Sequence, residues 1–128
     1  MKLLLDTHVL YWWLAERRQL SAASLAAISD VNAEVFVSVV SVWEMSIKVG
    51  VGKWESARLI VDEFERHLSV EAIKVLSMTI PHVRAAGLMQ SPRRDPFDRL
   101  LAAQAIAEGL TLVTADTKVQ GLGATWVW

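Results

Sequence analysis

Three short apolar runs, each closed by a polar residue and followed at once by a helical pattern, constrain the fold more than any other feature. They are Lys2–Asp6 (KLLLD), Val35–Val40 (VFVSVV) and Leu110–Thr114 (LTLVT). Each run is too short for a helix and too continuously apolar for a strand with one face in water. We therefore expect parallel strands that are buried on both faces. Ile73–Leu76 is a further strand candidate, and Trp126–Trp128 is a candidate for a last strand at the edge of the sheet.

Helical patterns occupy much of the chain between these runs. We expect helices over Thr7–Ala15, Ala22–Val31, Val42–Val49, Ala57–Leu68, Ile80–Met89 and Pro96–Glu108. Strands that alternate with helices predict a three-layer α/β/α sandwich around a mostly parallel central sheet. At 128 residues the chain has the size of one domain, and we expect residues 1–128 to form it.

Composition excludes several classes of site. The chain has no cysteine, which excludes disulfides, thiolate metal sites and cysteine nucleophiles. Its formal net charge of −1 gives no general attraction for nucleic acid, so such binding requires a local basic patch. The chain also lacks a glycine-rich phosphate-binding motif and an apolar segment of roughly 18 residues that would span a membrane. We expect a cytoplasmic protein.

Four acidic residues are the candidate site. Asp6 ends the first apolar run, Glu44 lies one helical turn beyond the second, and Asp116 follows the third by two residues. Asp98 lies in the first turn of the helix predicted to begin with Pro96. Ligands of open parallel sheets bind beyond the carboxyl ends of the strands, which is where the first three acids should meet. A site with carboxylate ligands and no thiolates favours a hard divalent cation, Mg²⁺ or Mn²⁺.

Each acid also fits a helix-capping role. Ser41 and Glu44 match a capping box, and the aspartates that follow strands are common N-caps. Asp98 fits an acid in a first helical turn, behind Asp95 at the N-cap, and we assign Asp95 to the cap alone. Capping does not require the acids to share one edge of a sheet, whereas a metal site does.

Basic residues adjoin two of the acids. Arg93, Arg94 and Arg99 surround Asp98 in the sequence, and Lys48 follows Glu44. They are candidates for binding the phosphates of a nucleic acid, with an ordinary solvated surface as the alternative.

Aromatic residues are also frequent near the acids. Trp12, Trp13, Trp43 and Trp54 could stack on bases or form an interface, although core packing explains most tryptophans. We interpret the three histidines, His8, His67 and His82, as packed or surface residues, because they do not have metal-ligand spacing.

Three stretches of the chain resemble a known family. LLLDTHVLYWWL, SVVSVWEMSIKVGVGK and RDPFDRLLAAQAIAEGLTLVTAD are similar, in this order, to PIN-domain ribonucleases, and specifically to the VapC toxins of bacterial toxin–antitoxin pairs. The resemblance implies Mg²⁺- or Mn²⁺-dependent cleavage of RNA. It places the acidic motif on Asp6, Glu44, Asp98 and Asp116, with Thr114 as a polar neighbour. It further implies a homodimer and a cognate antitoxin whose C-terminal segment blocks the site. His8 stands where the family often has asparagine.

The sequence hypothesis is a metal-dependent endoribonuclease. One alternative is a phosphohydrolase that uses Asp6 as a nucleophile, although such enzymes usually carry a second acid two residues on, where this chain has His8. The other alternative is a non-catalytic protein-binding module in which the acids only cap helices.

Overall fold

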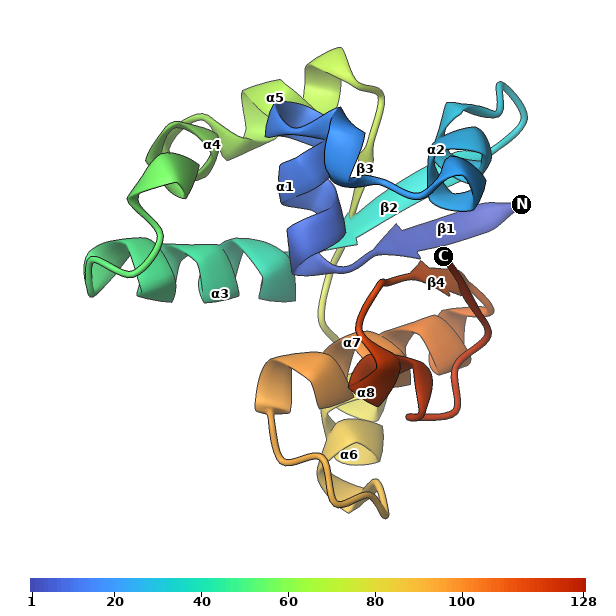
Figure 1. The fold of residues 1–128 in the computed structure, drawn as a ribbon. Coiled ribbons are helices and arrows are strands. Elements are labelled where there is room, and N and C mark those ends of the chain that lie inside the picture. The colour runs from blue at the N-terminus through green and yellow to red at the C-terminus, as the bar shows by residue number, and fades with distance from the viewer.

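The computed structural model describes residues 1–128 and has a five-stranded sheet with helices on both faces (Figure 1). Its strands are β1 (Lys2–Leu5), β2 (Glu34–Ser38), β3 (Lys74–Leu76), β4 (Thr111–Val113) and β5 (Trp126–Val127). They follow the order β3-β2-β1-β4-β5, and all four pairings are parallel. The predicted three-layer sandwich is confirmed, with β5 at an edge.

The helices match most of the predicted segments. They are α1 (Thr7–Ala15), α2 (Ala22–Ser29), α3 (Val39–Gly50), α4 (Arg58–Asp62), α5 (Phe64–Val70), α6 (Ile80–Leu88), α7 (Pro96–Glu108) and α8 (Thr117–Gln120), with short 3₁₀ helices η1 (Arg17–Gln19) and η2 (Glu55–Ala57). Helices α1 and α7 have the predicted bounds. The single helix predicted over Ala57–Leu68 is wrong, because the backbone leaves the helical region at Glu63 (φ −122°, ψ 39°) and divides it into α4 and α5. The short helix α8 was not predicted.

The junction between β2 and α3 differs from the sequence prediction in a way that affects the site. The strand ends at Ser38 and the helix begins at Val39, whereas we predicted a strand to Val40 and a helix from Val42. The Ser38 side chain is the N-cap and accepts a hydrogen bond from the amide of Val40 at 3.0 Å. Ser41 and Glu44 therefore lie inside the helix, and the capping box predicted for them is wrong.

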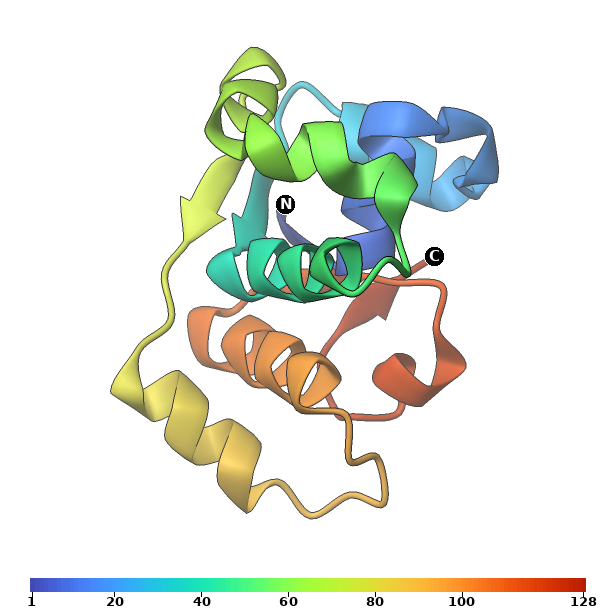
Figure 2. The same ribbon diagram turned by 90° about the vertical axis from the view of Figure 1, so that its left-hand side faces the viewer.

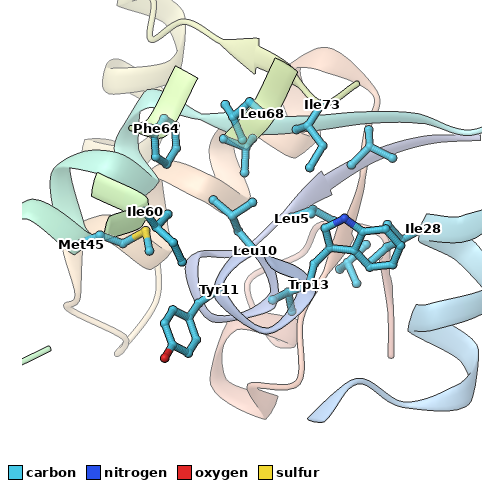
Figure 3. Packing of buried hydrophobic residues seen from close by; sticks show 14 of the residues in the cluster. Leu5, Leu10, Tyr11, Trp13, Ile28, Met45, Ile60, Phe64, Leu68 and Ile73 are labelled. Atoms are coloured by element: carbon cyan, nitrogen blue, oxygen red, sulfur yellow. The ribbon is translucent and has the colours of Figure 1, made fainter. Parts of the chain in front are cut away.

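Alternate residues of β1 build the two halves of the core. Leu3 and Leu5 pack on one face of the sheet with residues of α1 to α5, and Figure 3 shows Leu5 beside Leu10 in this cluster. Leu4 packs on the other face with residues of α7 and α8. The view in Figure 2 shows α6 and α7 lying side by side below the sheet. All three leucines are fully buried, as expected for a strand covered on both faces.

The order of the strands determines where a ligand can bind. From β1 the chain moves to β2 and β3 on one side, and it later adds β4 and β5 on the other side of β1. In open α/β sheets, such a reversal of strand order opens a crevice at the carboxyl ends of the strands concerned, here β1 and β4. The two strand ends are joined directly, because the amide of Asp6 donates to the carbonyl of Val113 at 3.1 Å.

The model contains no helix that is both long enough and apolar enough to span a lipid bilayer.

Candidate active site

A cavity of about 290 Å³ opens beyond the carboxyl ends of β1 and β4. The four predicted acids all line it: Asp6, Glu44, Asp98 and Asp116. The remaining lining residues are Thr7, His8, Trp12, Leu101, Ala115 and Val119. The structure thus brings together carboxylates from four separate segments of the chain.

Asp6 both caps a helix and lines the cavity. Its Oδ1 accepts a hydrogen bond from the amide of Val9 at 2.9 Å, which makes it the N-cap of α1. Burial raises the pKa of Asp6 to about 6, against the lowering effect of hydrogen bonds from Thr114 and Val9. The negative charges of Asp98 and Glu44 raise this pKa further. The folded protein therefore destabilises the ionised form of Asp6. A carboxylate that only caps a helix is usually stabilised in its ionised form.

Glu44 is held by residues of two helices. Its Oε1 accepts from the Thr7 hydroxyl at 2.7 Å, and its Oε2 accepts from Lys48 Nζ at 3.0 Å. The Thr7 hydroxyl also lies 3.0 Å from Ser41 Oγ, so α1 and α3 are joined by a buried polar contact. The sequence analysis did not assign Thr7 and Ser41 to the site. Two signals were available: Thr7 directly follows Asp6, and Ser41 lies three residues before Glu44 on the same helical face.

Asp98 is paired with an arginine from the preceding loop. Arg93 Nε donates to Asp98 Oδ2 at 2.7 Å, and a second guanidinium nitrogen of Arg93 contacts the same oxygen. Burial nevertheless raises the pKa of Asp98 above its ordinary value. Asp95 is the N-cap of α7, as predicted, and its carboxylate accepts from the amides of Phe97 and Asp98.

Asp116 completes the ring of acids from the loop after β4. It is the N-cap of α8, accepting from the amide of Lys118 at 2.9 Å. Its own amide donates to the buried Thr114 hydroxyl at 3.1 Å, and Arg93 approaches its Oδ2 to 3.7 Å. Thr114 also lowers the pKa of Asp6, so this threonine adjoins two of the acids.

The four carboxylates match the donor set of a hard divalent cation. No group of three or more histidine, aspartate and glutamate side chains is arranged to hold an ion in this conformation. Lys48 and Arg93 supply the positive charge instead, at Glu44 and Asp98. Oxygen donors without sulfur fit Mg²⁺ or Mn²⁺.

A second, polar cavity of about 470 Å³ adjoins the acids. It is lined by Ser91, Pro92, Arg93, Arg94, Thr117, Lys118 and Gly121. No acidic residue lines it, so it is suited to an anion. The sequence analysis named Arg93 and Arg94 but did not name Lys118, which the fold brings to them from α8.

Arg99 has a different environment from the other predicted RNA-binding residues. Its guanidinium donates to backbone carbonyls of the segment 86–93, including Met89 at 2.6 Å and Ala86 and Arg93 at 3.0 Å. The side chain fixes the loop that carries Arg93 onto α7. Its donors are used within the protein, so the structure shows a loop-holding role for Arg99, and RNA binding by this residue stays a prediction.

The histidines divide between the site and the core. His82 is buried and caps α6 by accepting from the amide of Thr79 at 3.1 Å, as a packing role predicts. His8, in contrast, is a surface residue that stacks on Trp54 and lines the acidic cavity. Partial desolvation by the surrounding side chains lowers the pKa of the exposed His8, with a further lowering from the charge of Lys48.

Comparison with known proteins identifies one family and a related ribonuclease. The family model described as PIN domain matches residues 3–123. Ribonuclease VapC22 of Mycobacterium tuberculosis (strain ATCC 25618 / H37Rv) is 31% identical, over 91% of this chain and 88% of that protein.

Solved structures share the fold at lower identity. VapBC2 from Rickettsia felis, bound to a DNA fragment from its promoter, superposes with a TM-score of 0.67 at 19% identity, covering 99% of this chain and 98% of that one. VapBC-1 from nontypeable Haemophilus influenzae gives 0.61 at 19% identity, covering 99% and 97%.

Proposed function

This chain belongs to the PIN-domain family and is of the VapC type, and from that premise we propose that it is the endoribonuclease toxin of a toxin–antitoxin pair. The observation that carries the proposal is the meeting of Asp6, Glu44, Asp98 and Asp116 at one cavity. The family membership and this donor set together favour RNA cleavage over the two alternatives, the Asp6-dependent phosphohydrolase and the non-catalytic module.

The same four acids would hold a divalent cation, Mg²⁺ or Mn²⁺. When bound, such a cation supplies Lewis acidity that activates water and offsets charge on the phosphoryl oxygens. Thr7 orients Glu44 through its 2.7 Å hydrogen bond, and Thr114 holds the backbone of Asp116 by accepting from its amide at 3.1 Å. These hydroxyls hold the carboxylates at the cavity even though repulsion between like charges drives them apart. They are therefore positioning residues, and the acids are the metal-binding residues.

The RNA phosphates would lie along the basic residues on both sides of the acids. Arg93, Arg94 and Lys118 surround the anion-accepting cavity on one side, and Lys48 lies at Glu44 on the other. One guanidinium group can donate two parallel hydrogen bonds to a phosphate. Arg94 is suited to this contact because its side chain is exposed and has no ion-pair partner in the protein. A chain with net charge −1 needs this local patch to hold a polyanion.

The proposed toxin function also implies protein partners. We expect a cognate antitoxin that covers the cavity, and a homodimer as the working unit, in the cytoplasm. Exposed apolar side chains at Met78, Ile80 and Val83, which line one shallow hollow at the start of α6, support an interface there.

Chelation tests the proposed function directly. Purified protein should cleave a mixed-sequence RNA in Mg²⁺ or Mn²⁺ and lose that activity in excess EDTA, because the carboxylates alone cannot activate water. Asp98→Asn protein purified in the same way controls for a contaminating nuclease. Full cleavage in EDTA, or equal cleavage by Asp98→Asn, would overturn the metal-dependent mechanism.

Neutralising Arg93 and Arg94 together tests the basic patch. The double glutamine variant should bind single-stranded RNA more weakly and with a shallower salt dependence. Each lost phosphate contact lowers the slope of log K against log salt by about 0.7. A titration of RNA binding at several salt concentrations measures this slope. Glutamine at exposed Arg66, which pairs only with Glu63, is the matched control and should leave the slope unchanged.

A further inference from the structure

Aromatic side chains form a continuous wall beside the acidic cavity. His8 and Trp12 lie four residues apart on α1, and both line the cavity. The His8 ring stacks on Trp54, with ring centroids 4.8 Å apart and an interplanar angle of 21°. Trp12 is 5.9 Å from the His8 ring and 5.8 Å from the Trp128 ring. We name His8, Trp12 and Trp54 the aromatic wall.

The aromatic wall is accessible. Trp12 and Trp54 are only partly buried, and His8 is exposed, although the core beside them buries Trp13 and Tyr11. Trp12 and Trp54 pack partly against the hydrophobic core, and the rest of each side chain remains accessible. His8 and Trp12 line the same cavity as the four carboxylates, so a molecule that reaches the acids also reaches these two rings.

Charge is placed to suit a nucleotide at this wall. Lys48 Nζ lies 3.0 Å from Glu44 Oε2 and 5.5 Å from the centroid of the Trp54 ring. A cation between a carboxylate and an aromatic face can meet a phosphate while the adjoining base meets the ring. The anion-accepting cavity around Arg94 and Lys118 lies on the other side of the acids and has no aromatic lining.

We propose that the aromatic wall is a base-stacking subsite, which holds an unpaired base of the RNA next to the scissile phosphate. The proposal rests on the proposed ribonuclease function and adds the place where a base is held, because only an unpaired nucleotide can present a splayed base to these rings. Stacking on an aromatic side chain accepts any base, so the subsite selects for single strands and not for sequence. Each stacked base contributes about 1–3 kcal/mol by alanine substitution of the ring.

The test removes the base and the ring separately. The substrates are a single-stranded RNA oligonucleotide with one preferred cleavage position and a matched set with a single abasic ribose moved along the nucleotides that flank that position. The proteins are the parent, Trp12→Leu, Trp12→Phe and Trp54→Leu, and the control Trp126→Leu removes an exposed tryptophan on β5, outside the cavity. Initial rates at low substrate give kcat/KM for every pair.

One abasic position should lower kcat/KM of the parent about five- to hundredfold, as expected for the loss of one stacked base. For Trp12→Leu, kcat/KM on the intact RNA should already be lower than the parent's by a similar factor. The same abasic ribose should then lower the kcat/KM of this variant only slightly. Such coupling between ring and base identifies a direct contact. Trp12→Phe should restore part of the coupling, Trp54→Leu should weaken it, and Trp126→Leu should match the parent.

A second measurement separates failure of the subsite from failure of the nuclease site. The rise in melting temperature on adding Mg²⁺ should be the same in Trp12→Leu as in the parent, since the carboxylates are unchanged. If the parent cleaves no RNA, the proposed function fails. If the parent cleaves RNA without an abasic penalty, the stacking subsite is wrong. It is also wrong if the abasic penalty in Trp12→Leu and in Trp54→Leu is as large as in the parent. Loss of antitoxin binding with an unchanged abasic penalty would also overturn it, since the wall would then be a protein interface.

Discussion

Replacing Asp6 with asparagine is expected to make the protein more stable at neutral pH in EDTA while lowering its ribonuclease activity at least about a hundredfold. Loss of a group that only orients a metal ligand costs about 10–100-fold, and loss of a ligand costs more. The stability gain has a separate origin, because asparagine keeps the N-cap of α1 and removes a buried charge.

The sign and size follow from the pKa of Asp6. Burial raises this pKa from 3.8 to about 6 in the folded protein. The folded state thus holds the proton more tightly, so the contribution of Asp6 to stability is complete below about pH 4 and is lost as the pH rises through about 6. The free energy of unfolding falls by about 3 kcal/mol in total, since each unit of difference between the folded and unfolded pKa corresponds to about 1.4 kcal/mol. For a chain of this size that is roughly 10 °C in melting temperature.

Melting curves from pH 4 to pH 8 in EDTA measure the effect. Asp6→Asn should melt close to the parent at pH 4 and well above it at pH 7.5. Asp30→Asn is the control, because exposed Asp30 also bonds a nearby amide, that of Asn32 at 2.9 Å, but lies away from the cavity. A variant that tracks the parent at every pH would mean that Asp6 carries no buried charge.

Magnesium is expected to stabilise the parent protein and not the Asp98→Asn variant. A ligand that binds only the folded state stabilises it by about 2.7 kcal/mol at a hundred times its dissociation constant. In EDTA the substitution should change stability little, because it removes the ion pair with Arg93 but also a carboxylate whose pKa is raised by burial. The difference between the proteins should therefore appear only when the cation is added.

The control for this experiment is a neighbouring acid of the same kind. Asp95→Asn keeps the N-cap of α7 and lies outside the cavity, so it should gain as much from Mg²⁺ as the parent does. Thermal melts of the three proteins with and without Mg²⁺ decide the matter. Equal gains in all three would place the cation elsewhere, and equal losses with and without Mg²⁺ would make Asp98 a helix-terminus residue only.

Local sequence determined the strands and most helices, because their signals act over short range. Continuous apolar runs such as Leu3–Leu5 can be buried on both faces only inside a layered α/β fold. Asp95 and Gly109 mark the two ends of α7 through backbone preferences, with Gly109 in the left-handed region at φ 66°. The presence of three acids at strand ends followed from the same logic, since parallel strands share one carboxyl edge.

Only the tertiary structure decided what each acid contacts. The sequence pattern of a capping box at Ser41 and Glu44 is present, but Ser38, three residues earlier, is the N-cap of α3. Glu44 therefore lies inside the helix and contacts Thr7, 37 residues away in the sequence. The same holds for Arg99, which was predicted to bind RNA but donates to its own loop, and for Lys118, which was not predicted but lines the cavity with Arg93 and Arg94. Whether a guanidinium meets carbonyls of its own loop or lines an open cavity depends on contacts between segments, and no spacing within a segment encodes them.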